Sequence, residues 1–340
     1  MFFGIEKFQN NLDLTIFINL LIYIVVLLGV PTIFLAFLSL FKIKTSNKRS
    51  IYLYAFSTGM FLIIGAAGFI KEGFFKLEYY FHDPKSGAQI TQGSLIKEQG
   101  YIALIVGGAA LIGLLIVIVG RYLFIKYSKV EMHAHHNEHA HSDHLVSFKD
   151  IDNPKAAWTA ILMLLSHRII DGLVLGISVY QLTALGYHKA NLALIITFNV
   201  HLLIEVIIVF YRQIQYGQTK GKAILYNFIT LILIIPIMFL GAFLGQYINN
   251  IQWLEPFLYC MGGAIIVFMS IIELVPEFIH YRNESPKTIY ITLFVLAISI
   301  VLTLIFLSFH THNQSSGSIT GGIEIVKESR NWGTILWRKI

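Results

Sequence analysis

Long apolar stretches govern what this chain can fold into. Eight of them run through the 340 residues, and each reaches the roughly 20 residues that a helix needs to cross about 30 Å of hydrocarbon. Lipid offers no partner to backbone N–H and C=O groups, so such stretches must satisfy them internally as helices. The sequence therefore predicts an all-α integral membrane protein with eight transmembrane helices in one bundle. They are expected near residues 14–41, 52–71, 101–125, 157–186, 190–211, 223–248, 254–279 and 288–309.

The connections between these helices give the expected organisation of the chain. Residues 1–125 hold helices one to three, with an outside loop at 72–100, and residues 126–156 form a cytoplasmic loop. Residues 157–309 hold helices four to eight, and 310–340 form a flexible tail.

The distribution of basic residues predicts the orientation. Fourteen Lys and Arg residues lie in the loops after helices one, three, five and seven, against six in the amino terminus and opposite loops and four in the tail. Lys and Arg favour the cytoplasmic side, so both termini of a multi-pass protein of the cell membrane should face outward. The basic residues are not gathered on one face, which argues against a nucleic-acid partner.

The cytoplasmic loop is rich in histidine. Its stretch "EMHAHHNEHAHSDH" contains six histidines within twelve positions, interleaved with acidic residues and with almost nothing to bury. Imidazole is a common ligand for Zn²⁺ and its neighbours, so the loop is expected to contact metal ions weakly; the alternative is a merely solvated loop. The candidate loop ligands are His133, His135, His136, His139, His141 and His144.

Helices four and five each carry a histidine and a carboxylate one turn apart. His167 and Asp171 are four residues apart, and so are His201 and Glu205, which places each pair on one helix face. If the hairpin turns near Gly186, the two pairs lie at matching heights near the middle of the membrane.

These four side chains are therefore expected to converge on one site. Two imidazoles and two carboxylates suit a Zn²⁺-like ion, whose charge would neutralise both anions. Any one of them alone could be a structural hydrogen-bonding residue, but two pairs in register favour a metal site with the ligands His167, Asp171, His201 and Glu205.

This arrangement resembles the ZIP family of divalent-metal transporters. The stretch "HRIIDGLVLG" on helix four matches the family's His-Asn-x-x-Asp/Glu-Gly motif except at its second position, and "HLLIE" on helix five keeps both ends of its His-Glu-x-x-His/Glu motif. "GGAIIVFMSIIELVPEF" on helix seven is similar to the family's Gly-rich segment. The resemblance implies alternating access that carries divalent metal toward the cytoplasm. It also implies that homodimers are common and that no organic cofactor or enzymatic activity is present.

The departures from the family pattern concern its second metal. This chain has Arg168, Leu202 and Ile235 where many family members have ligands of a second ion, which indicates a single-metal variant. Arg168 is the one Arg or Lys outside the predicted loops, termini and helix ends. We expect its guanidinium to take the place of the second cation and to pair with Asp171 or Glu205.

The predicted function is transport of divalent transition-metal ions, Zn²⁺ first, through this site. Glu273, Glu277 and His280, at the inner end of helix seven, are candidates for an exit path, although Glu277 and His280 are equally compatible with simple interfacial positions. The alternatives are an intramembrane zinc-dependent hydrolase and a receptor-like metal sensor. A hydrolase needs an activated water and a general acid or base, and helices four and five offer no residue beyond the four ligands for that role.

Overall fold

The structure is a computed structural model, and all of its regular elements within the described residues are helical. The described residues are 3–40, 47–82, 95–128, 168–184, 192–215, 218–275 and 285–308. The helices are η1 (Ile5–Phe8), α1 (Leu12–Leu40), α2 (Asn47–Ile63), the π-helix η2 (Ile64–Ile70), α3 (Lys71–His82), α4 (Leu95–Ser128), α6 (Arg168–Ala184), α7 (Leu192–Gln215), α8 (Lys220–Ile232), α9 (Ile234–Asn250), α10 (Leu254–Met269), the π-helix η3 (Ser270–Leu274) and α12 (Pro286–Ser308).

The predicted class of an all-α membrane protein is confirmed. Six helical segments within the described residues are long and apolar enough to cross a membrane. They are Leu12–Leu40, Ile51–Phe81, Lys97–Gly120, Lys220–Asn250, Leu254–Ile272 and Pro286–Ser308. The predicted fourth and fifth spans are described only in part, as α6 and α7, so the total of eight stays a prediction.

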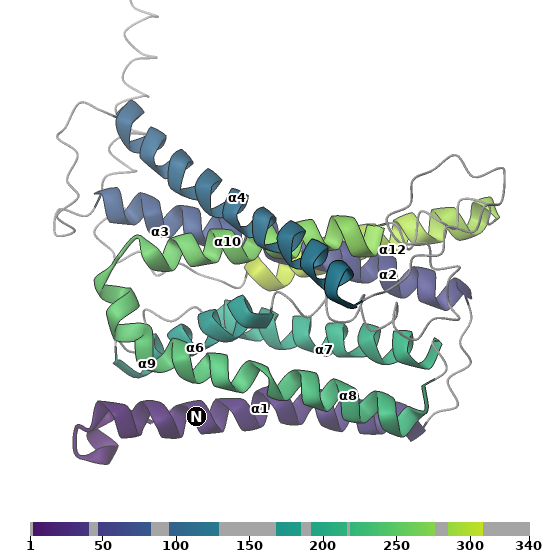
Figure 1. Cartoon of the computed structure of the whole chain (residues 1–340), viewed down its shortest axis with the longest axis horizontal. Helices are drawn as coiled ribbons and strands as arrows, with labels where there is room; N and C mark the ends of the chain where they lie inside the picture. Colours follow the sequence, from purple (N-terminus) through teal and green to yellow (C-terminus); the bar gives the residue numbers. More distant parts are fainter. Residues whose placement is uncertain are drawn as a thin grey trace, which may run out of the picture.

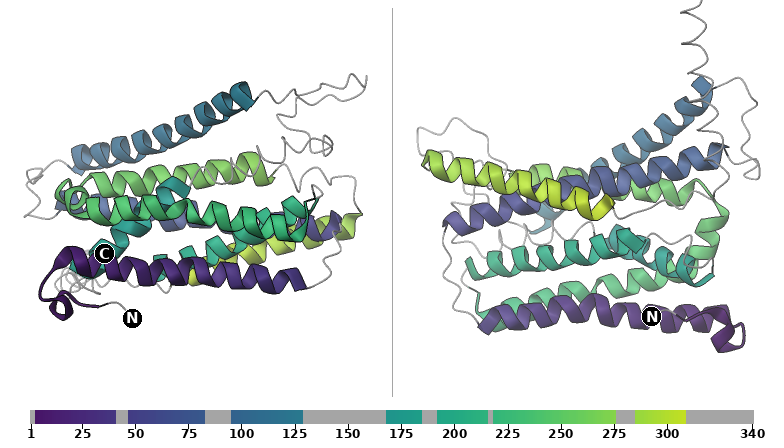
Figure 2. Two further views of the ribbon diagram at one scale, coloured as in Figure 1. Left: turned by 60° about the horizontal axis from the view of Figure 1, so that its bottom comes forward. Right: turned by 180° about the vertical axis from the view of Figure 1, so that it is seen from behind.

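The helices pack as two groups, which Figure 1 shows as a lower and an upper layer. The first, here called the α6 group, consists of α1, α6, α7, α8 and α9, and its tightest pairing is α6 on α9. The second, the α10 group, consists of α2 with η2, α3, α4, α10 and α12, in which α10 packs on α4 and η2, and α12 packs on α2. The view from behind in Figure 2 keeps the same division. The groups meet where α7 lies against α2 and α12, and where α10 lies against α6 and α9.

Glycines hold α6 and α9 together at backbone distance. A Cβ added at Gly176 would lie 2.2 Å from the Met238 carbonyl oxygen, and one at Gly241 would lie 2.3 Å from the Leu173 carbonyl oxygen. No side chain fits between the two backbones, so they lie in direct van der Waals contact. Lipid tails are as apolar as the side chains, so dispersion contacts of this kind, rather than the hydrophobic effect, stabilise the helix pair. This packing fixes the rotation of α6, the helix that carries Asp171.

The predicted outside loop at 72–100 is wrong at both of its ends. Helix α3 continues to His82, and α4 already begins at Leu95. The loop is predicted from a mixed polar and aromatic composition with turn signals at Asp83-Pro84 and Gly87. In the structure Glu72 is buried, and Lys76 forms an ion pair with Glu255 of α10. A charged side chain is tolerated inside a membrane helix when another helix supplies its partner.

The predicted sixth span is interrupted at a single residue near its centre, Leu233. Helix α8 ends at Ile232 and α9 begins at Ile234, close to Pro236. Proline has no N–H to donate to the carbonyl four residues earlier and its ring crowds that position, so a helix kinks or breaks there. The break lies next to Thr230, whose carbonyl takes part in the site described below.

Candidate metal centre

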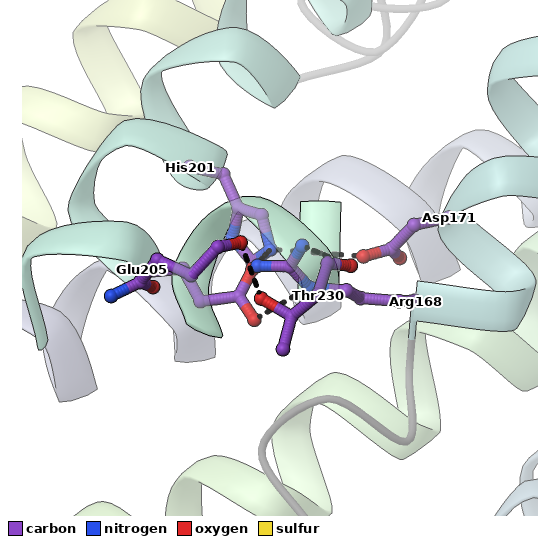
Figure 3. Close-up of polar contacts among 6 residues, drawn as sticks. Arg168, Asp171, His201, Glu205 and Thr230 are labelled. Carbon is purple, nitrogen blue, oxygen red and sulfur yellow. Dashed lines mark hydrogen bonds and ion pairs between the residues drawn. The ribbon is translucent and has the colours of Figure 1, made fainter. Parts of the chain in front are cut away.

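Helices α6 and α7 bring together four of the ionisable residues singled out from the sequence. Figure 3 shows Arg168 and Asp171 on one side of the cluster and His201 and Glu205 on the other. Arg168 is 4% exposed, and the other three are fully buried. His167, the fourth candidate ligand, directly precedes α6 and lies outside the described residues. The structure thus brings together three of the four candidate ligands and Arg168.

The Arg168 guanidinium joins three helices. Its Nε donates a hydrogen bond to Glu205 Oε1 at 3.1 Å, and its Nη1 donates one to the Thr230 carbonyl oxygen, also at 3.1 Å. Glu205 is on α7 and Thr230 is near the end of α8. The sequence predicts Asp171 or Glu205 as the partner of Arg168, and in the structure the ion pair forms with Glu205.

His201 lies between two carboxylates from different helices. Its Nε2 is 3.9 Å from Asp171 Oδ2 and 3.9 Å from Glu205 Oε2, which are separations longer than hydrogen bonds. The edge of the Phe61 ring, from α2 of the α10 group, packs against the imidazole with ring centroids 4.6 Å apart. The imidazole is therefore fixed by an aromatic contact on one side and by two acidic groups on another.

The charges of the cluster favour a further cation. Among the described residues of the cluster, two carboxylates and one guanidinium lie in an apolar interior, where a bound divalent cation would be attracted strongly by the two acidic groups. Two ligand atoms that bind one tetrahedral ion at 2.0–2.1 Å lie about 3.4 Å apart. The distances from His201 Nε2 to the nearest oxygens of Asp171 and Glu205 are 3.9 Å, so each would have to shorten by a few tenths of an ångström. Among the described residues, no group of three His, Cys, Asp or Glu side chains is already arranged as a metal cage.

The other predicted site residues lie beyond what the structure describes. Glu273 is part of η3, but its side chain is outside the described set, as are Glu277 and His280. The six loop histidines also fall outside the described ranges. Their assignment as exit path and loop ligands stays a prediction.

A second buried polar cluster was not predicted from the sequence. Glu255 of α10 accepts a hydrogen bond from Gln181 of α6 and pairs with Lys76 of α3. Glu255 opens an apolar segment beside a proline, and Lys76 falls in the segment predicted as a loop, so neither was expected inside the membrane. One signal could have revealed this cluster: Lys76 and Glu255 are charged residues of opposite sign that each lie within a few residues of an apolar stretch of helix length.

The long apolar helices define a multi-pass membrane protein, and the buried cluster on α6 and α7 places ionisable groups inside it. No protein-family model matches the chain. Among curated proteins, the chain is 24% identical over 149 residues to the zinc transporter ZIP10 of Danio rerio, covering 44% of this chain and 16% of that protein.

Two further relatives give the same result. The chain is 23% identical over 161 residues to the zinc transporter ZIP10 of Homo sapiens, covering 46% of this chain and 18% of that protein. It is 25% identical over 144 residues to the zinc transporter ZIP6 of Homo sapiens, covering 42% and 18%. The chain thus spans less than a fifth of the length of these relatives. The matches indicate a ZIP-family relationship, in agreement with the resemblance drawn from the motifs, and the relatives are named as transporters rather than enzymes.

Proposed function

We propose that this protein carries divalent transition-metal ions, Zn²⁺ first, across the membrane toward the cytoplasm. The site is formed by His167, Asp171, His201 and Glu205, and the ion passes by alternating access. The observation that carries the proposal is the position of His201, 3.9 Å from a carboxylate oxygen of both Asp171 and Glu205 on two helices of one buried group. The similarity to ZIP10 and ZIP6 zinc transporters supports the same substrate class.

The ligand chemistry suits transport better than permanent storage. Imidazole and carboxylate groups bind Zn²⁺ and similar ions, whereas a closed set of four thiolates makes a structural site. The single cysteine, Cys260, lies on α10 and is not part of the cluster. An ion held by His and carboxylate groups can therefore be released when the site opens to the other side.

Arg168 acts in this proposal as a tethered cation. Its charge compensates Glu205 while the site holds no metal, and an arriving divalent ion must take over Glu205 from the guanidinium. This exchange replaces the second metal ion that related transporters would hold at this place. It also keeps the metal-free site close to neutral, which lowers the cost of burying two carboxylates.

The remaining assignments belong to the same proposal. The six histidines of the loop at 126–156 collect ions on the cytoplasmic side, and Glu273, Glu277 and His280 pass the ion out of the membrane. Both termini face outward, and two copies form a homodimer.

The test is uptake of Zn²⁺ into proteoliposomes that contain the purified full-length chain. We expect uptake by the wild type and at least a tenfold loss in His201→Ala, with Fe²⁺, Mn²⁺ and Cd²⁺ as competitors that rank the ions. Ile169→Ala is the matched control, since Ile169 adjoins Arg168 on α6 but is 60% exposed. A wild type that binds Zn²⁺ yet carries none across would contradict transport and favour the sensor or hydrolase.

A further inference from the structure

The α6 and α10 groups are joined at one end of the bundle by polar side chains. Gln181 Nε2 of α6 donates a hydrogen bond to Glu255 Oε2 of α10 at 2.8 Å. Ser178 of α6 and Tyr259 of α10 are neighbours across the same boundary. The spacings of three residues on α6 and four on α10 place each pair on one helix face. These four residues are called the α6–α10 clasp.

Lys76 anchors the clasp on the side of α10. Its ammonium forms an ion pair with Glu255 Oε1 and lies 4.8 Å from the centroid of the Tyr259 ring. Both contacts are within the α10 group, because Lys76 belongs to α3. Glu255 therefore has a charged partner in its own group and only an amide partner across the boundary. If the groups separate, Glu255 keeps its ion pair and loses a single neutral donor.

The clasp lies between one end of the bundle and the buried site. Gln181 is ten residues beyond Asp171 on α6, which corresponds to about 15 Å along the helix. It is near the Ala184 end of α6, the end at which α10 begins and at which α3 ends. At the depth of the site, the contacts across the boundary are apolar or aromatic: Phe61 packs on His201, and a Cβ at Gly262 would lie 2.5 Å from Ile170 Cγ2.

Separation within either group is disfavoured by close glycine packing. In the α6 group, Gly176 and Gly241 bring the backbones of α6 and α9 into contact, as described above. In the α10 group, a Cβ at Gly65 of η2 would lie 2.8 Å from the Gly263 carbonyl oxygen of α10. Packed interfaces of this kind move as units, so a large rearrangement should occur at the boundary between the groups.

We propose that the α6–α10 clasp is the outer gate of the metal site. An ion reaches Asp171, His201 and Glu205 from outside only when Gln181 leaves Glu255 and α6 moves away from α10 at this end. Lys76 holds Glu255 in place during opening, so the gate closes again on the same contact. This inference rests on the proposed transport function and on the predicted outward orientation of this end.

A cross-link across the clasp tests the gate directly. Cys260 is the single cysteine of the chain, so Cys260→Ala gives a thiol-free background. Gln181→Cys with Glu255→Cys is then bridged by a short bifunctional methanethiosulfonate reagent, because a disulfide needs Cα atoms within about 7 Å. We expect Zn²⁺ uptake by the full-length protein in vesicles to fall at least tenfold on cross-linking and to return on reduction.

A matched cross-link inside the α6 group is the control. Asn19 Nδ2 of α1 donates to Thr183 Oγ1 of α6 at 3.0 Å, so Asn19→Cys with Thr183→Cys bridges a similar distance near the same end. This bridge should leave uptake unchanged. Equal uptake before and after bridging 181 to 255, or an equal block by the control bridge, would overturn the gate.

A second measurement needs no transport and leaves Glu255 with Lys76. Ile170→Cys in the Cys260→Ala background places one thiol at the boundary, inward of the clasp. Adding Gln181→Glu places a second carboxylate beside Glu255, and the repulsion between the two should open the clasp. Gln181→Met is the uncharged control of similar length. In cells, we expect a charged, impermeant maleimide to label the thiol at least tenfold faster with Gln181→Glu than with Gln181. Equal labelling rates with Gln181→Glu and with Gln181 would overturn the gate. The expected difference in labelling rate, found in a protein that takes up no Zn²⁺, would instead count against the transport function alone.

Discussion

Arg168 Nε and Glu205 Oε1 lie 3.1 Å apart in a fully buried ion pair between α6 and α7. Removing one partner of such a pair is strongly destabilising, because the other charge stays buried without compensation. Replacing both partners by apolar residues of similar volume is often nearly neutral. The same guanidinium also contacts the Thr230 carbonyl, so it couples the site to the broken end of α8. The measurable affinity of the site for metal is thus a competition with a cation of the chain itself.

Arg168→Gln should bind Zn²⁺ more tightly and release it more slowly. The neutral side chain no longer competes for Glu205, so we expect at least a tenfold lower Kd by calorimetry, together with slower uptake. Without metal, its apparent Tm in detergent should fall, since Glu205 loses the ion pair with Arg168. Arg168→Lys is the control that keeps the charge but cannot form both hydrogen bonds of the guanidinium. Wild-type affinity and uptake in Arg168→Gln would remove the tethered-cation role.

Glu205→Gln should destabilise the metal-free protein, and a second substitution should recover part of that stability without restoring uptake. The single variant removes the carboxylate that forms the buried ion pair with Arg168, and breaking such a pair costs on the order of 3–5 kcal/mol. Arg168→Gln with Glu205→Gln should recover part of this loss in a double-mutant cycle, because the guanidinium is removed together with its ion-pair partner while Asp171 keeps its charge. Neither variant should take up Zn²⁺, since the carboxylate ligand is gone. Strictly additive losses of Tm would show that the ion pair contributes no coupling.

Gly176→Ala and Gly241→Ala should each separate α6 from α9. The added methyl would meet backbone oxygens at 2.2 and 2.3 Å, which cannot move aside as a side chain can. Overpacking of this kind typically costs about 1–3 kcal/mol and would displace Asp171 from the site. Gly29→Ala on α1 is the control, because nothing lies within 4 Å of its added Cβ. The apparent Tm and the Zn²⁺ uptake of each variant are compared with those of the wild type. A Gly176→Ala protein with wild-type Tm and uptake would contradict the close packing.

Asn19→Leu should release the amino-terminal segment from the bundle. Asn19 accepts a hydrogen bond from Phe3 N at 2.8 Å and donates to the Phe3 carbonyl at 2.9 Å, besides its bond to Thr183. The two bonds to Phe3 are part-buried, so their loss costs less than the roughly 1–3 kcal/mol typical of a fully buried group left unsatisfied. Hydrogen exchange at residues 3–8 should quicken in Asn19→Leu but not in Thr183→Val, which removes only the bond to α6. Unchanged exchange in both variants would count against this anchor.

Several features of the fold follow from the order of residues alone. Apolar length predicts membrane helices because each helix satisfies its own backbone wherever it lies in lipid. The spacing of four residues places His201 and Glu205 on one face of α7 because helical geometry is local. The break near Pro236 likewise depends on a missing N–H that the sequence displays. These properties need no knowledge of neighbouring helices.

Only the tertiary structure decided which charges are tolerated inside and what they contact. Lys76 looked like a loop residue until α10 placed Glu255 beside it, and that ion pair lets α3 continue to His82. Arg168 could have paired with either carboxylate, and the approach of α7 and α8 selected Glu205 and the Thr230 carbonyl. The sequence determines how far each helix runs through lipid and which face carries its polar groups. The partner of a buried charge is set by packing, because the cost of burial depends on atoms that another helix supplies.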